Sequence, residues 1–114
     1  MVKKSYVPRR GDIVLLSFSP QQGREQKGRR PALVISDREY NALSGLAVVC
    51  PVTSVVKGYP FEFLLPQVLK TKGVVLLDQI KSLDWQHRDV AYIEHLPGKN
   101  MEDAFVLLSV FIQG

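Results

Sequence analysis

The chain has 114 residues, of which 46% are hydrophobic and 23% charged, and 15 Lys and Arg against 11 Asp and Glu give a net charge of +4. This length suits a single domain, residues 1–114, with a hydrophobic core of its own. The single cysteine excludes a disulfide framework, and one cysteine with two histidines is too few for a zinc finger. The sequence shows neither a long apolar run nor a signal peptide, which favours a cytoplasmic protein without a membrane span.

The positive charge is concentrated at the start of the chain. Residues 1–30 carry eight basic and two acidic side chains, a net of +6, whereas residues 31–114 carry seven basic and nine acidic, a net of −2. A basic patch attracts polyanions, chiefly nucleic acid. A surface that only keeps the protein in solution is the alternative at this point.

Short apolar runs separated by proline and glycine predict a compact β-rich fold. The run Pro31–Ser36 is almost continuously apolar, which predicts a strand buried on both faces. Ser36 or Asp37 is expected to cap a short helix that continues to Leu43. In chain order, the expected strands are Asp12–Phe18, Pro31–Ser36, Leu46–Val52, Phe61–Leu65, Gly73–Leu77, Gln79–Leu83 and Val90–Ile93.

The C-terminal segment has a different pattern. Apolar residues at positions 101, 104, 105, 108, 111 and 112 form one face of a helix, and Asn100 with Asp103 forms a variant of a capping box. This helix is expected to pack across the strands or to serve a dimer. Many short strands, a short inserted helix and a terminal helix predict a mainly β (β+α) fold, namely a small antiparallel barrel of the SH3-like type.

The first candidate site is the polar segment from Gly23 to Pro31. It holds one carboxylate, Glu25, and four cations, which are Arg24, Lys27, Arg29 and Arg30. Arg30 stands nearest the strand and is expected to be the most fixed, and its planar fork of donors suits a phosphate. Glu25 would be its ion-pair partner or a proton acceptor. An ordinary solvated loop is the alternative.

The second candidate lies after the third strand. The hydroxyls of Thr53 and Ser54 stand at the strand end, followed by the cation Lys57 and the aromatic Tyr59. Hydroxyls donate to phosphate oxygens, and an aromatic ring stacks on an unpaired base. The alternative is that hydroxyls at a strand end satisfy backbone groups.

The third candidate, Asp78 to Arg88, combines an amide, Lys81, an aromatic ring and an imidazole. Trp85 is expected in the core. No spacing rule ties His87 to His95, so we expect surface histidines rather than an acid–base pair. No phosphate loop, nucleophile elbow or metal motif is present, and an enzyme built on these residues would work without metal or cofactor. Composition and spacing alone lead to a small basic β-rich domain that contacts nucleic acid.

The candidates follow one another in an order that resembles the MazF/PemK/Kid family, the toxins of bacterial toxin–antitoxin modules. The resemblance extends from about Tyr6 to the C-terminal helix. It is carried by Gly11-Asp12, Pro20, Gly23-x-Glu25-Gln26-x-Gly28-x-Arg30-Pro31, Pro51-x-Thr53, Lys57-Gly58-Tyr59-Pro60-Phe61-Glu62 and Asp78-Gln79-x-Lys81-Ser82.

The resemblance implies a homodimeric barrel toxin that cuts single-stranded RNA at a short sequence without metal. It also implies an antitoxin whose acidic C-terminal segment occupies the RNA groove. By position, Arg30 and Thr53 match the catalytic arginine and threonine of the family, and Glu25 and Arg88 match positions tied to activity in some members. Lys57 and its neighbours match the segment that contacts RNA bases.

Two other functions remain open for such a scaffold, because a fold does not fix a function. One is a toxin that acts on DNA gyrase, which needs no phosphate-cleaving arginine. The other is a non-catalytic RNA-binding module. The apolar stretch Ser54-Val55-Val56 leaves the recognised RNA sequence open.

Overall fold

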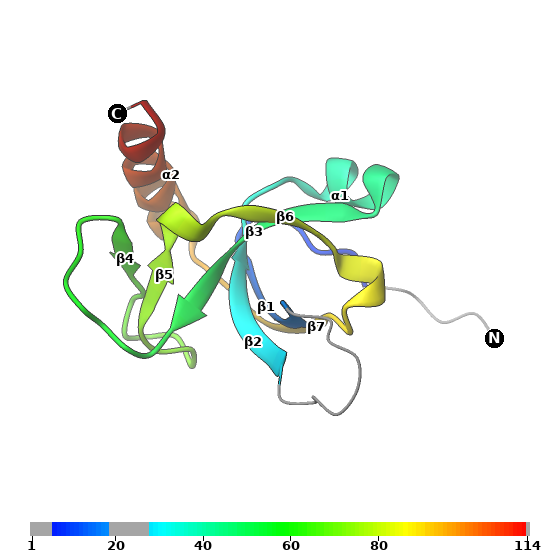
Figure 1. The fold of residues 1–114 in the computed structure, drawn as a ribbon, viewed down its shortest axis with the longest axis horizontal. Coiled ribbons are helices and arrows are strands. Elements are labelled where there is room, and N and C mark those ends of the chain that lie inside the picture. The colour runs from blue at the N-terminus through cyan, green and yellow to red at the C-terminus, as the bar shows by residue number, and fades with distance from the viewer. Residues whose placement is uncertain (1–5, 19–27, 114) are drawn as a thin grey trace.

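The computed structural model describes residues 6–18 and 28–113 (Figure 1). The seven strands within these ranges form one antiparallel sheet in the order β4-β5-β3-β2-β1-β7, and β6 also pairs with β3. The predicted mainly β fold with two helices is confirmed. The elements are β1 (Asp12–Ser17), β2 (Arg29–Val34), α1 (Arg38–Ser44), β3 (Leu46–Thr53), β4 (Glu62–Leu64), β5 (Val74–Leu76), η2 (Leu77–Gln79), β6 (Lys81–Asp84), η3 (Trp85–His87), β7 (Ala91–His95) and α2 (Gly98–Gln113).

Strand β3 joins two parts of the sheet. Its first half pairs with β6 from Leu46 to Val49, and its last two residues, Val52 and Thr53, pair with β5. Because β2 occupies the other edge of β3, β6 and β5 follow one another along a single edge. β3 therefore runs out of the curved sheet formed by β1, β2, β6 and β7 and into the small β4–β5 sheet, with Thr53 at its end (Figure 1).

The core has two layers, because strand side chains alternate between the faces of the sheet. Val34 of β2 packs inside the barrel, whereas Leu33 packs on the opposite face, which α2 covers through Met101 and Leu108. Burial of β2 on both faces is thus confirmed. The inner layer contains Val14, Leu16, Ala32, Val34, Ala47, Val49, Leu83 and Trp85.

Buried polar contacts attach α1 to the barrel. Trp85 is a core residue, as expected, and its indole Nε1 donates to the carbonyl oxygen of Asn41 at 3.0 Å. The fully buried Asn41 side chain donates in turn to the carbonyl of Pro8 at 2.8 Å. Cys50 is also buried, and this burial raises the pKa of its thiol to about 12.

The start of α1 was predicted correctly from the sequence, whereas the predicted start of α2 was wrong. The Asp37 carboxylate accepts the Tyr40 N–H at 2.9 Å, so the predicted cap of α1 is confirmed. The expected cap of α2 at Asn100 is wrong, because α2 starts at Gly98 and the Met101 N–H donates to the Pro97 carbonyl at 3.0 Å. The chain turns from β7 into the helix almost at once, which leaves Asn100 inside the first turn.

Helix α2 buries only part of its apolar face. Met101, Ala104 and Leu108 pack on the sheet, whereas Phe111 and Ile112 near its end are exposed. Among residues 6–18 and 28–113, no helix combines the length and the apolar character needed to cross a membrane.

Candidate active site

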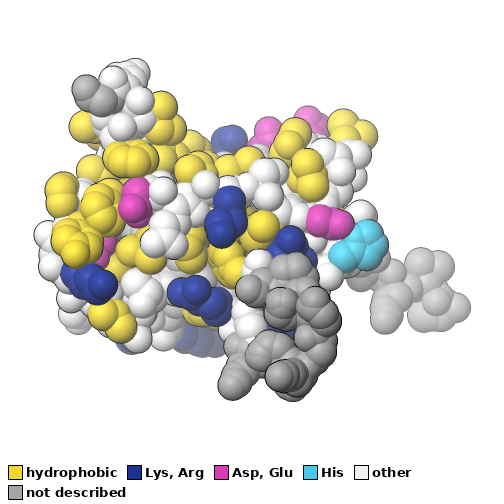
Figure 2. All heavy atoms as spheres, in the orientation of Figure 1, with side chains coloured by type: hydrophobic (Ala, Val, Ile, Leu, Met, Phe, Trp, Pro, Cys, Tyr) yellow, Lys and Arg dark blue, Asp and Glu magenta, His cyan; other side chains and the backbone are white. Residues whose placement is uncertain are grey.

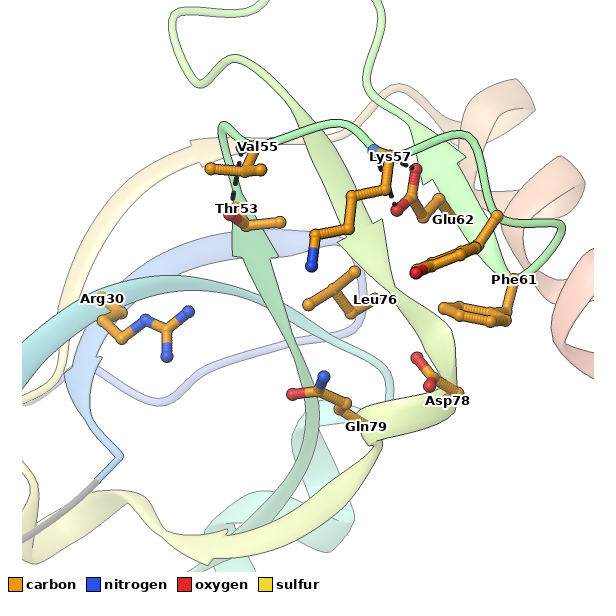
Figure 3. A pocket seen from close by; sticks show the side chains of 10 residues that line it. Arg30, Thr53, Val55, Lys57, Phe61, Glu62, Leu76, Asp78 and Gln79 are labelled. Carbon is orange, nitrogen blue, oxygen red and sulfur yellow. Dashed lines mark hydrogen bonds between the residues drawn. The ribbon is translucent and has the colours of Figure 1, made fainter.

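The ends of β2 and β3 bring Arg30 and Thr53 to one place. The β2–β3 ladder ends at the pair Ala32 and Pro51, so Arg30 lies two residues beyond the ladder on β2 and Thr53 lies two residues beyond it on β3. Both side chains line a cavity of about 500 Å³ (Figure 3). The residues of the first and second candidate segments therefore share one wall.

Arg30 lies on a strand, not in the loop that the sequence pattern indicated. β2 begins two residues earlier than expected, because Arg29 and Arg30 pair with Ser17 and Leu16 of β1. The exposed Arg30 guanidinium lies 5.8 Å from the centre of the Phe18 ring. Strand pairing and a cation–π contact thus fix both ends of this side chain.

Phe18 also connects Arg30 to Lys81, because the Lys81 Nζ lies 5.6 Å from the centre of the same ring. The ring packs against the inner core layer, so it holds both cations at the rim of the barrel. Lys81 itself does not line the cavity. Sequence reasoning missed Phe18, since its position as the last apolar residue of a strand gave no signal of a role beyond the core.

The Thr53 side chain forms a hydrogen bond with the backbone, which was the alternative to phosphate binding in the sequence analysis. Its Oγ1 accepts the Val55 N–H at 3.1 Å (Figure 3). This bond uses an acceptor lone pair and leaves the hydroxyl proton free to donate. The contact therefore orients Thr53 as a donor toward the cavity rather than removing it from the chemistry.

The loop after β3 forms the far wall of the cavity. The Glu62 carboxylate accepts the N–H groups of Lys57 and Gly58 at 3.2 and 2.9 Å, which holds the loop closed. The Lys57 side chain extends into the cavity (Figure 3). Tyr59 and Phe61 also line the cavity, and the centres of their rings lie 5.0 Å apart. An aromatic wall next to a cation suits a nucleobase joined to a phosphate.

Two further polar residues, Asp78 and Gln79, line the cavity from η2. Both belong to the third candidate segment but were not singled out as site residues. The short turn between β5 and β6 presents their side chains at the edge of the cavity opposite Thr53 (Figure 3). The sequence did contain a sign of this site, because Asp78 and Gln79 form a polar pair directly after an apolar strand.

A second cavity, of about 490 Å³, adjoins the first and shares Arg30 and Thr53 with it. Its other polar lining residues are Ser54, Thr71 and Lys72. Basic side chains are spread across this face of the molecule between hydrophobic ones (Figure 2). We refer to these two cavities, which share Arg30 and Thr53 in their linings, together as the groove.

Glu94 of β7 fixes the loop that carries Lys72. Its carboxylate accepts the N–H groups of Lys70 and Thr71 at 3.0 and 2.7 Å and the Thr71 hydroxyl at 2.6 Å. Burial raises the pKa of Glu94, but these hydrogen bonds outweigh it and leave the pKa lowered from about 4.5. The carboxylate therefore stabilises the folded chain in its ionised form.

We expect Glu94→Gln to destabilise the protein at neutral pH and to matter less in acid. A lowered pKa contributes stability that is fully present above the ordinary value of about 4.5 and is lost as the pH falls through the folded value. The measurement is the urea-unfolding free energy of both proteins from pH 7 to pH 3. A difference between them that stays constant over this range would contradict the role given to the carboxylate.

Other predicted site residues lie apart from the cavities. Arg29 forms an ion pair with Asp89 at 3.7 Å, and Arg88 donates to the carbonyls of Ser17 and Phe18, both at 2.9 Å. Arg88 thus ties the segment before β7 to the end of β1. Three predicted residues, Arg24, Glu25 and Lys27, lie outside the described residues.

The two histidines do not form a pair. The His87 ring bonds the Asp84 carboxylate at 2.6 Å on the surface, and the partly buried His95 ring bonds Asp12 at 2.8 Å. The part of the chain that the structure describes holds no group of three or more His, Cys, Asp or Glu side chains suited to a metal ion.

The fold and the groove define a small β-barrel protein with a cationic, aromatic-lined cleft suited to a polyanion that carries bases. A family model described as "PemK-like, MazF-like toxin of type II toxin-antitoxin system" matches residues 9–111, and the chain belongs to this family. The predicted family is therefore confirmed.

Individual proteins show the same relationship. The Endoribonuclease toxin MazF of Escherichia coli K12 is 45% identical over 83 residues, which cover 73% of this chain and 74% of that protein. The Endoribonuclease toxin ChpB of the same strain is 36% identical over 99% of this chain and its own full length. The crystal structure of MazF (Form-I) from Deinococcus radiodurans matches with a TM-score of 0.84 and 45% identity over 96% of this chain and 100% of that chain.

Proposed function

We propose that this protein is the toxin of a type II toxin–antitoxin module and a metal-independent endoribonuclease. It cleaves single-stranded RNA, mRNA in particular, at a short sequence in the cytoplasm and thereby inhibits translation. Relatives that match most of the chain are named as endoribonuclease toxins. The observation that supports the proposal is that Arg30 and Thr53 line the same cavity, so that a cationic fork of donors and a hydroxyl donor border one space.

The reaction uses the RNA's own nucleophile. The 2′-oxygen attacks the adjacent phosphorus, the bond from phosphorus to the 5′-oxygen breaks, and the products are a 2′,3′-cyclic phosphate and a 5′-hydroxyl. The 2′-hydroxyl loses its proton to a base, and the departing 5′-oxygen gains one. Negative charge builds up on the phosphoryl oxygens in between, where fixed donors lower the barrier by about 3–4 kcal/mol each.

We propose that Arg30 stabilises this negative charge and that the Thr53 hydroxyl donates a second hydrogen bond to the same phosphate. A guanidinium stays protonated in proteins, which makes Arg30 a poor base. Glu25 is the conventional base, or else it orients Arg30. Two carboxylates, Glu62 and Asp78, line the cavity, and Glu62 accepts the N–H groups of Lys57 and Gly58. Glu25→Gln and Asp78→Asn therefore form a matched pair. The base is the residue whose variant loses the acidic limb of the pH–rate profile.

The remaining predicted residues bind the RNA chain. Ser54, Lys57 and Tyr59 contact the bases and the adjoining phosphates, since Lys57 and Tyr59 line the aromatic side of the first cavity and Ser54 lines the second. The more distant phosphates of the RNA are proposed to be bound by five further cations, which are Arg24, Lys27, Arg29, Lys81 and Arg88.

Thr53→Val is expected to lower kcat about 10²-fold, the effect typical of removing one donor from a developing oxyanion. The exposed Val55 N–H can turn to water, so folding should be retained. Thr53→Ser keeps the hydroxyl and is expected to stay within a few-fold of the wild type. Single-turnover cleavage rates of the three proteins are the measurement, and equal rates for the valine and serine variants would remove Thr53 from the mechanism.

The proposal is tested by incubating the purified protein with a long single-stranded RNA in excess EDTA and mapping the new 5′ ends. Discrete cuts at one short motif would support a metal-free, sequence-specific ribonuclease and identify its target. A substrate with a 2′-deoxy sugar at the cut position should bind without being cut. Intact RNA from a folded protein would direct attention to DNA gyrase or to RNA binding without cleavage.

Two partners are part of the proposal. A second copy is supported by Val110, Phe111 and Ile112, which leave apolar surface exposed at the end of α2, and only monomers in sedimentation at micromolar concentration would count against it. A cognate antitoxin is supported by the MazE–MazF complexes solved from Deinococcus radiodurans. Its acidic C-terminal segment would occupy the cationic groove, and the encounter should weaken at high salt.

A further inference from the structure

The loop between β4 and β5 carries a lysine, Lys72, that does not line the first cavity. This loop runs past the end of β3 (Figure 1). Lys72 lines the second cavity together with Arg30 and Ser54. It also lines a third cavity of about 340 Å³ with Val56, Leu64 and Gln67. Lys72 therefore borders the second and third cavities, whereas Arg30 and Thr53 border the first and second.

Three contacts hold Lys72 in this position. The Lys72 ammonium donates to the Gln67 carbonyl at 2.8 Å, which uses one of its three protons and leaves two free. The Glu94 carboxylate fixes the preceding residue, Thr71. The following residue, Gly73, lies so near β3 that a Cβ built on it would come within 2.0 Å of the Thr53 carbonyl oxygen.

We propose that Lys72 forms a second phosphate subsite, which binds a phosphate of the same RNA strand on one side of the scissile bond. This inference rests on the proposed function, since it extends the path of that substrate. Arg30 and Thr53 line both the first and the second cavity, so a strand held at the scissile phosphate passes directly into the hollow that Lys72 borders. An ammonium with two free protons is a suitable donor to a non-bridging phosphate oxygen.

The subsite binds substrate without touching the reacting atoms. It contributes to the ground state and the transition state alike, so its loss raises KM or Kd and leaves kcat nearly unchanged. One exposed charge pair is worth about a 3- to 5-fold change in affinity. Removal of the contact should also lower the salt dependence of binding by about 0.7 in the slope of log K against log salt for a single strand.

The test compares Lys72→Ala with Lys70→Ala. Both variants remove one exposed lysine from the same loop, but the Lys70 side chain lines none of these three cavities. The probe is a single-stranded RNA oligonucleotide with a 2′-deoxy sugar at the cut position, and its Kd is measured by fluorescence anisotropy. A second series of probes replaces one phosphate at a time by an uncharged methylphosphonate.

We expect Lys72→Ala to weaken binding about 3- to 5-fold and Lys72→Glu about 10-fold, whereas Lys70→Ala stays near the wild type. At one position, the methylphosphonate should weaken binding to the wild type by the same factor and have no further effect on Lys72→Ala. Equal affinities of the Lys72→Ala and Lys70→Ala variants, or methylphosphonate penalties identical in wild type and Lys72→Ala, would overturn the subsite. Failure of the nuclease proposal gives a different result, namely an all-ribose RNA that is bound by the wild type but not cut.

Discussion

Replacement of Arg30 by alanine is expected to lower kcat/KM for RNA cleavage about 10³-fold, the upper end of the range for one lost donor at a developing oxyanion. The reason is its position, since Arg30 lines the same cavity as Thr53. Arg30→Lys keeps the charge but loses the planar fork, so most of the loss should persist.

The effect should come from chemistry rather than from folding. The Arg30 side chain is exposed, and its guanidinium lies over the face of the Phe18 ring. Thermal unfolding of Arg30→Ala is therefore expected to match that of the wild type. Arg38→Ala is the control, because it removes an equally exposed cation at the start of α1, which lines neither cavity. A folded Arg30→Ala protein that cuts RNA at the wild-type rate would refute the mechanism.

Gly73→Ala is expected to destabilise the protein by about 3 kcal/mol or more, the range reserved for substitutions that strain the backbone. The backbone φ of Gly73 is +114°, which side-chain-bearing residues rarely adopt. An added Cβ would also lie 2.0 Å from the Thr53 carbonyl oxygen and 2.8 Å from the Ser54 Cα. These are backbone atoms of a paired strand, so they cannot move away without breaking the β3–β5 pairing at Thr53.

The same substitution should also damage the site, because a shift of β3 moves Thr53 and Ser54 together. The measurements are urea unfolding and cleavage under conditions in which the variant is still folded. Gly98→Ala is the control: it places a methyl group in open space at the start of α2 and should change stability by less than about 1 kcal/mol. A Gly73→Ala protein as stable and active as Gly98→Ala would show that the close approach at β3 is not required.

Much of the fold could be predicted because it depends on neighbours in the chain. The Asp37 cap, the strand periods and the apolar face of α2 each involve residues within a few positions of one another. The predicted ends of the strands were less accurate. Arg30 lies inside β2 because it pairs with β1, and Gln79 lies in η2 rather than in a strand. In both cases a partner distant in sequence decided where the element ends.

The candidate site divides in the same way. The sequence marked Arg30, Thr53, Lys57 and Tyr59 by residue type and by resemblance to the family, and all four line the first cavity. The roles of Phe18 and Glu94 had no local signal, because each depends on a contact with a residue at least ten positions away. Lys72 gave no signal either, because it shares a cavity with Arg30 and Ser54, which are distant in sequence. The sequence suggested RNA binding for Arg88 by its charge, and only the structure shows that its guanidinium also donates to the carbonyls of Ser17 and Phe18.

The barrel class, the order of its elements and the available chemical groups could be predicted from the amino-acid sequence, because side-chain period, turn residues and donor types are local properties. Which of these groups lie close together depends on the three-dimensional fold. The pairing of β2 with β3 brings Arg30 and Thr53 to one cavity, and the pairing of β5 with β3 brings Gly73 against the end of β3. A register is fixed by hydrogen-bonded ladders and by the packing of both sheet faces together, and no short window of sequence contains that information.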